Sequence, residues 1–103
     1  TKNFEFQRVY NSGRKSQSSS LIAYVVPGTS LRFGVVASYK SIGNAVKRNR
    51  AKRLLREAFR AAAKKQKYLE GDYVLIARRP ILETPFSELQ EELSLCLQKL
   101  LSA

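Results

Sequence analysis

The sequence predicts an α+β fold, in which helices pack on a small mixed sheet as a two-layer sandwich. Short runs rich in β-branched and aromatic residues at 21–26, 31–38 and 73–78 are typical of strands, whereas the segment 44–66 contains neither glycine nor proline and is typical of a long helix. The expected order is helix, strand, strand, helix, strand, helix, with room for one more strand before the second helix. A chain of 103 residues is long enough for one core only, so residues 1–103 are predicted to form a single domain.

The first predicted element is a short helix over residues 3–12. Apolar residues recur there at i, i+3 and i+4, and Asn3 precedes them as a possible N-cap. The next stretch, 13–20, is polar and rich in serine. It is predicted to be a mobile loop.

Two strands are expected next, at 21–26 and 31–38. The dipeptide Pro27-Gly28 lies between them and is typical of a tight turn, so the two strands are predicted to pair as a hairpin. A loop over residues 38–43 is predicted to follow.

The long helix is predicted to begin after Asn44, which is placed to cap it, and to end near residue 66. The apolar run 73–78 is short and suits a buried strand. Thr84 and Pro85 then supply an N-cap and a proline at the first helical position of a last long helix. The apolar stripe of this last helix consists of Phe86, Leu89, Leu93, Cys96 or Leu97, and Leu100.

The charge balance predicts a polyanionic partner. There are 19 Lys and Arg residues against 8 Asp and Glu residues, which gives a formal net charge of +11. Nucleic acid is the favoured partner, and an anionic membrane is the alternative. No apolar run approaches the ~18 residues of a spanning helix and no signal peptide is recognisable, so no membrane association and a cytoplasmic location are expected.

Catalysis by the protein itself is not expected. The chain has no histidine, which removes the commonest general base and metal ligand, and its one cysteine, Cys96, lies among leucines and is predicted to be a buried structural thiol. No glycine pattern of a nucleotide-binding loop occurs. The carboxylates near the last helix are interpreted as a solvated face. We therefore predict no catalytic residue, no metal ligand and no small-molecule substrate.

The long helix carries most of the positive charge. Its apolar residues fall on one face that should pack on the sheet, and its arginines fall on the opposite face. Between Lys40 and Arg60 there are eight cations, and Glu57 is the only anion. A solvated helix face is the ordinary interpretation of a charge run. The uniform sign and the preference for arginine, which binds phosphate bidentately, instead favour RNA or DNA binding.

A family resemblance rests on these residues. The segments 43–53 and 55–60 resemble the RNR signature of the bacterial ribonuclease P protein component, and the likeness extends to 6–10, 32–36 and 72–78. It therefore covers nearly the whole chain. One departure is that the family usually has Ser-Lys-Lys before the signature, where this chain has Ser-Tyr-Lys-Ser-Ile at 38–42.

The resemblance implies a role for the chain. In this family the protein assists a catalytic RNA that removes the 5′ leader of precursor tRNA, with Mg²⁺ ions bound mainly by the RNA, and the fold contains a left-handed βαβ crossover. Charge and resemblance together predict that the residues in contact with the catalytic RNA are Lys40, Arg48, Asn49, Arg50, Lys52, Arg53, Arg56 and Arg60. A cleft between the first helix and the sheet is implied to bind the leader through Phe6, Arg8, Tyr10 and Tyr24.

Alternatives remain open at this point. Phe6, Tyr10 and Tyr24 could be ordinary packing residues, because aromatic side chains are common in cores and on strands. A ribosomal-protein-like RNA-binding module without a role in tRNA processing would share the composition. A nuclease that cuts RNA on its own is the enzyme alternative.

Overall fold

The computed structural model describes residues 14–27, 31–65 and 71–102, so the helix predicted at 3–12 lies outside the described residues. The described residues form one four-stranded sheet in the order β1-β2-β4-β3. The strands are β1 (Arg14–Gln17), β2 (Leu21–Pro27), β3 (Leu31–Val36) and β4 (Gly71–Ala77). The helices are α2 (Tyr39–Ile42), α3 (Ala45–Lys65), the 3-10 helix η1 (Arg79–Glu83) and α4 (Phe86–Ser102).

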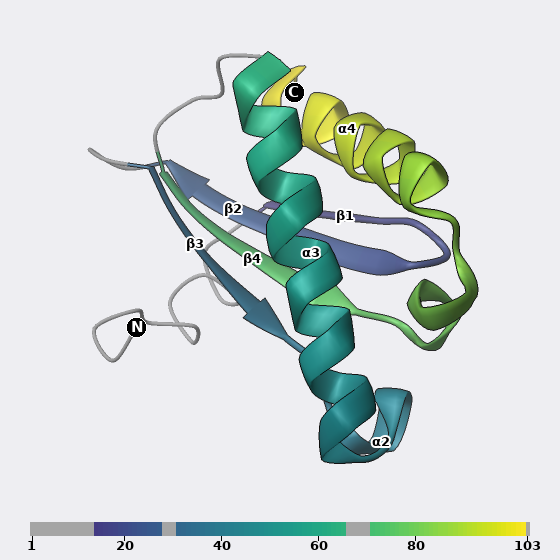
Figure 1. The fold of residues 1–103 in the computed structure, drawn as a ribbon. Coiled ribbons are helices and arrows are strands. Elements are labelled where there is room, and N and C mark those ends of the chain that lie inside the picture. The colour runs from purple at the N-terminus through teal and green to yellow at the C-terminus, as the bar shows by residue number, and fades with distance from the viewer. Residues whose placement is uncertain (1–13, 28–30, 66–70, 103) are drawn as a thin grey trace.

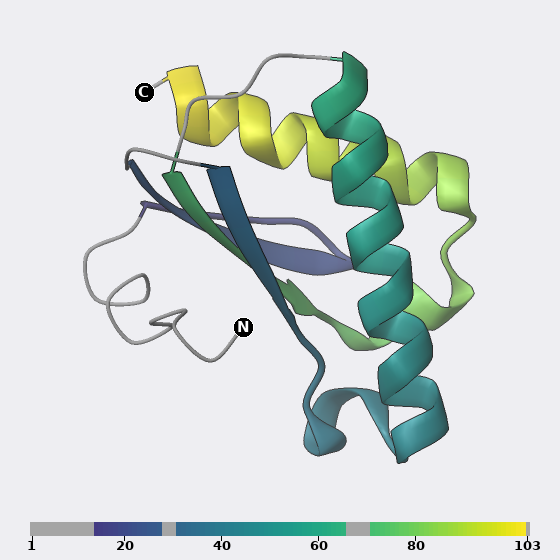
Figure 2. The ribbon, with the colours of Figure 1, turned by 60° about the vertical axis from the view of Figure 1, so that its left-hand side comes forward.

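The two-layer arrangement is confirmed. The helices α3 and α4 lie side by side on one face of the sheet (Figures 1 and 2). Between the layers lies an apolar core in which Phe59 of α3 stacks on Phe33 of β3, with ring centroids 4.5 Å apart, and tilts against Tyr73 of β4 at 5.4 Å. Aromatic pairs of this geometry contribute about 0.5–1.5 kcal/mol beyond the area they bury. They tie the long helix to the parallel strands β3 and β4.

The β3–α3–β4 unit is a left-handed crossover. β3 and β4 are parallel neighbours, with Phe33 opposite Tyr73. In Figure 1 both strands run downward, β4 lies to the right of β3, and α3 returns upward in front of the sheet. The connection therefore turns to the left, against the usual right-handed preference. This handedness is what the family resemblance implied.

The predicted hairpin between the second and third strands is wrong. β2 and β3 do not pair, because β4 lies between them, antiparallel to β2 and parallel to β3. The physical reason is the two-sided apolar character of β4. Its residues alternate between the helix-covered face and the opposite face, and nearly all are buried. A strand with two apolar faces is best buried at the centre of a sheet.

Two loop predictions are also corrected. Within the predicted loop at 13–20, Arg14–Gln17 forms the edge strand β1, which pairs antiparallel with β2. Within the predicted loop at 38–43, Tyr39–Ile42 forms the single helical turn α2, which Ser38 caps by accepting a hydrogen bond from the backbone N–H of Ser41 at 3.1 Å. Arg14–Gln17 is polar and Tyr39–Ile42 is a single turn, so neither shows the apolar periodicity that indicates an element.

The two long helices agree closely with prediction. The side chain of Asn44 accepts a hydrogen bond from the backbone N–H of Lys47 at 3.0 Å, which confirms it as the cap of α3. The predicted cap of α4 is wrong. The hydroxyl of Thr84 donates instead to the carbonyl of Pro80, at 2.8 Å, and hydrogen-bonds with the hydroxyl of Ser20. Helix α4 begins at Phe86, and Pro85 directly precedes it.

Candidate RNA-binding site

The helix α3 separates an apolar face from a cationic one. Its inner residues pack against the sheet and α4, as the periodicity predicted, and the buried members are Ala51, Leu55, Ala58, Phe59 and Ala62. Phe59 is only 1% exposed, and its ring stacks on Phe33. With the inner face anchored in this way, the opposite face of α3 has to point away from the sheet.

The outer face of α3 holds the predicted basic residues together. Asn49, Arg50, Arg53 and Arg60 are exposed, and Lys52 and Arg56 are partly exposed. A shallow groove of about 490 Å³ on this face is lined by Val46, Asn49, Arg50, Arg53 and Arg56. Val46 was not among the predicted site residues, although it is 77% exposed and lies one helical turn before Arg50.

The cations of this groove lack anionic partners in the part of the chain that the structure describes. The ion pair found there joins Arg32 to Asp72, outside α3. None of Arg50, Arg53 and Arg56 has an ion pair within the described ranges. Like charges spaced along a helix repel one another by a few tenths of a kcal/mol per pair. A polyanion placed along the groove would relieve this repulsion, and guanidinium groups suit phosphate best.

The N-terminal end of α3 adds a second cluster of cations. α2 places Lys40 beside the first turn of α3, and a hollow of about 410 Å³ is lined there by Tyr39, Lys40, Ile42, Gly43, Lys47, Arg79, Leu82 and Glu83. Arg48, which is partly exposed, lies over the ring of Tyr39 with 5.9 Å between Cζ and the ring centroid. Tyr39, Lys47 and Arg79 were not among the predicted site residues, and Arg79 comes from η1, which meets the first helical turns only in three dimensions.

The face of the sheet opposite the helices is also partly apolar. Tyr24 of β2, the one predicted leader-binding residue that the structure describes, is half-buried there and packs against a small cluster with Val26 and Val74 at its centre. The ammonium of Lys15 lies 6.0 Å from the centroid of the Tyr24 ring. Phe6, Arg8 and Tyr10 lie outside the described residues. Tyr24 and the arginines of α3 are therefore on opposite sides of the sheet.

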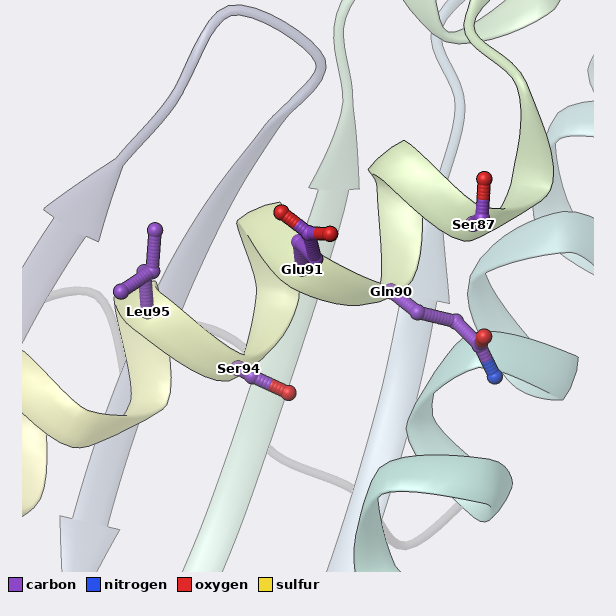
Figure 3. Close-up of a pocket in the computed structure, with 5 residues that line it drawn as sticks. All are labelled: Ser87, Gln90, Glu91, Ser94 and Leu95. Carbon is purple, nitrogen blue, oxygen red and sulfur yellow. The ribbon is translucent and has the colours of Figure 1, made fainter.

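A third hollow, on the outer face of α4, differs in charge. It measures about 400 Å³ and is lined by Ser87, Gln90, Glu91, Ser94 and Leu95 (Figure 3). Glu91 and Leu95 project to the outside, whereas Gln90 points toward α3 (Figure 3). No cation lines this hollow, so phosphate is disfavoured there, and the cationic surface of the helical layer is that of α3.

Three further observations concern the described residues. Cys96 is 3% exposed, in agreement with its predicted place in the core. Within ranges 14–27, 31–65 and 71–102, no three His, Cys, Asp or Glu side chains gather closely enough to hold a metal ion. The same ranges contain no helix that is long and apolar enough to cross a membrane.

A left-handed βαβ unit that carries an arginine-rich helix on its outside is the architecture of an RNA-binding protein subunit. The family model described as "Ribonuclease P" matches residues 1–101. The chain belongs to this family of ribonuclease P protein components, subunits of a ribonucleoprotein endoribonuclease of tRNA 5′-end maturation. This assignment decides against the ribosomal-protein alternative.

Similar proteins and structures agree with this assignment. The chain is 40% identical to the "Ribonuclease P protein component" of Bacillus pumilus over 101 residues, which cover 95% of this chain and 83% of that protein. The same component from Listeria monocytogenes is 36% identical over 95 residues, covering 89% and 78%. The structure of the Staphylococcus aureus RNase P protein superposes with a TM-score of 0.79 at 31% identity, covering 98% and 94%. The structure of the RNase P protein from Thermotoga maritima superposes with a TM-score of 0.79 at 26% sequence identity, over 92% of this chain and 90% of that chain.

Proposed function

We propose that the outer face of α3 is the surface on which this subunit binds the RNA of ribonuclease P. The observation that carries the proposal is the groove of Asn49, Arg50, Arg53 and Arg56, whose arginines have no ion-pair partner within the described residues. Phosphates of a folded RNA would supply the missing anions. The proposed contact residues are Lys40, Arg48, Asn49, Arg50, Lys52, Arg53, Arg56 and Arg60.

The second part of the proposal concerns the substrate. The 5′ leader of precursor tRNA would lie on the sheet face opposite the helices, where Tyr24 offers an aromatic ring beside the cation of Lys15. Aromatic rings beside cations suit unstacked bases of single strands. Phe6, Arg8 and Tyr10 complete the proposed leader site. Mg²⁺ would be held mainly by the RNA, and the cytoplasm is the proposed place of action.

The variant Arg53→Ala tests the RNA-binding surface. Arg53 is exposed on the outer face of α3, so its removal should leave the fold intact and remove one phosphate contact. The slope of log K against log salt for binding the ribonuclease P RNA should then fall by about 1. Precursor-tRNA cleavage by the reconstituted holoenzyme at low Mg²⁺ should fall with it.

Lys99→Ala is the matched control for this experiment, because Lys99 is an exposed cation on α4 and its loss changes the net charge equally. The control should keep the wild-type slope. Wild-type slope and affinity in the Arg53 variant would show that the RNA binds elsewhere on the molecule.

A further inference from the structure

The hollow at the corner of α2, α3 and η1 combines stacking and charge in one place. Tyr39 is 71% exposed, although the ring of an isolated surface tyrosine is usually covered in part by neighbours. Lys40, Lys47 and Arg79 line the same hollow from three different elements. The volume, about 410 Å³, is within the ~300–1,000 Å³ range of small-ligand sites.

Arg48 holds the ring from one side. Its guanidinium carbon is 5.9 Å from the Tyr39 centroid, and its Nε is buried with no hydrogen-bond partner among the described residues. The contact with the ring is therefore the interaction that the structure gives this guanidinium. When a cation lies over one face of an aromatic ring, the opposite face of the ring can still stack on a planar group. Tyr39 is thus fixed in place and still open to solvent.

We propose that this hollow is a binding site, called the seat below, for one unstacked nucleotide of RNA. Its base would stack on Tyr39, and its phosphates would lie beside Lys40, Lys47 and Arg79. Glu83 also lines the hollow, and its carboxylate would accept a hydrogen bond from an exocyclic amino group of the base. The proposal rests on the proposed RNA-binding function of α3, which it extends by a site that reads a base as well as phosphate.

The sequence context supports a stacking role for this position. In this chain an aromatic ring, Tyr39, stands directly before the cation Lys40 at the start of α2. Stacking on an aromatic side chain is nearly independent of salt, whereas a lysine–phosphate contact is not. Loss of the Tyr39 ring should therefore weaken RNA binding without changing its salt dependence, whereas loss of a neighbouring cation should change the salt dependence.

Tyr39→Leu tests the seat, because leucine keeps an apolar side chain and removes the ring. The full chain should bind the ribonuclease P RNA of the same organism about 5- to 150-fold more weakly, the effect of one lost stacked base, with the salt slope unchanged. Tyr39→Phe should restore most of the affinity, since it keeps the ring. Leu95→Ala, a change at an exposed apolar residue on α4, should bind like the wild type.

A second arm identifies which RNA supplies the nucleotide. Holoenzyme assembled with the leucine variant is titrated with precursor tRNA that has or lacks its leader. Weaker binding of the ribonuclease P RNA alone assigns the nucleotide to that RNA. Unchanged binding of that RNA with weaker binding of leader-carrying substrate assigns it to the leader. Either result supports the seat.

Three results would overturn the proposal. The first is that Tyr39→Leu binds like the wild type in both arms. In that case, weak binding by Arg53→Ala would show that the RNA-binding surface on α3 exists without the seat. The second is a reduced salt slope in Tyr39→Leu, which would mean that the ring only positions nearby cations. The third is a lowered urea midpoint in Tyr39→Leu, which would mean that the ring serves the fold. If Arg53→Ala also binds like the wild type, the proposed function fails as well.

Discussion

The ion pair between Arg32 and Asp72 joins side chains of the two parallel strands β3 and β4. The two residues are direct neighbours in the register of β3 and β4. Two hydrogen bonds link them, from Nε to Oδ1 at 2.9 Å and from a terminal nitrogen to Oδ2 at 2.8 Å. The Asp72 side chain is 6% exposed and that of Arg32 is 47% exposed. The pair therefore satisfies a nearly buried carboxylate with a half-exposed guanidinium.

Arg32→Ala should lower the free energy of unfolding by about 1–2 kcal/mol. Loss of the fork removes two charge-assisted hydrogen bonds from the nearly buried carboxylate, and the penalty stays below that of a fully buried pair because water reaches the arginine side. Urea denaturation measures the change. Arg32→Lys keeps the charge and loses the two-pronged geometry, so its free energy of unfolding should lie between those of the wild type and Arg32→Ala. Equal stability of all three would show that the pair contributes nothing.

A residue can also be predicted well from its local surroundings alone. Asn44 was recognised as a cap because capping depends on the residues that follow it within one turn. Gly43, just before it, has a φ of +119°, a conformation that L side chains rarely adopt. By contrast, the role of Ser20 was not recognised, because its partners Thr84 and Glu92 are distant in the sequence.

Among the elements, α4 has a second role in fixing the turn between β1 and β2. The carboxylate of Glu92 accepts hydrogen bonds from the hydroxyl of Ser18, at 2.7 Å, and from both the backbone N–H and the hydroxyl of Ser20, each at 3.1 Å. Ser20 is fully buried. The polar edge strand β1 is therefore held by a helix as well as by its partner strand.

Glu92→Ala should destabilise the fold by about 2 kcal/mol, because the backbone N–H of the buried Ser20 loses its acceptor and the hydroxyls of Ser18 and Ser20 each lose a bond to the carboxylate. The change in the midpoint of urea unfolding measures this loss. Glu91→Ala is the control, since Glu91 is exposed on the same helix, and it should change stability by less than ~0.5 kcal/mol. If both variants lose the same amount, the effect comes from the helix and not from the turn.

The elements that sequence could predict are those with a regular apolar pattern. The structure has α3 at Ala45–Lys65 where 44–66 was predicted, and β4 at Gly71–Ala77 where 73–78 was predicted. β1 escaped prediction because its four residues are polar and mostly exposed, so that its pairing is set by β2 and not by its own composition. α2 is a single turn, too short for any period to show.

At the scale of the whole molecule, the two proposed RNA surfaces lie on opposite sides of the sheet. The arginines of α3 face outward from the helical layer, and Tyr24 faces away from that layer. Substitutions on one side should therefore leave the other side intact. Separation of this kind makes binding of the ribonuclease P RNA and binding of the leader independently measurable.

Tyr24→Leu should weaken the binding of leader-carrying precursor tRNA to the holoenzyme by about 5- to 150-fold, the loss of one stacked base. Binding of tRNA without a leader should not change, and neither should the affinity of the subunit for the ribonuclease P RNA. Tyr24→Phe keeps the ring and is the matched control. Equal weakening of substrates with and without a leader would contradict the proposed leader site.

The arrangement of the whole molecule was the least accessible to sequence reasoning. The sequence pattern was sufficient for the two-layer class and for the cationic face, since both follow from the periodicity of single elements. The order of the strands could not be predicted from that pattern, because pairing joins residues far apart in the chain, such as Tyr24 with Val74. The corner of Tyr39 and Arg79 was missed for the same reason.

The central place of β4 has a consequence for biosynthesis. β4 is the last strand to be translated, yet both β2 and β3 require it as a neighbour. A nascent chain that has emerged only through α3 therefore has a β1–β2 pair and an unpartnered β3, and the inner face of α3 has no complete sheet to cover. Folding must wait for Ala77 to leave the ribosome.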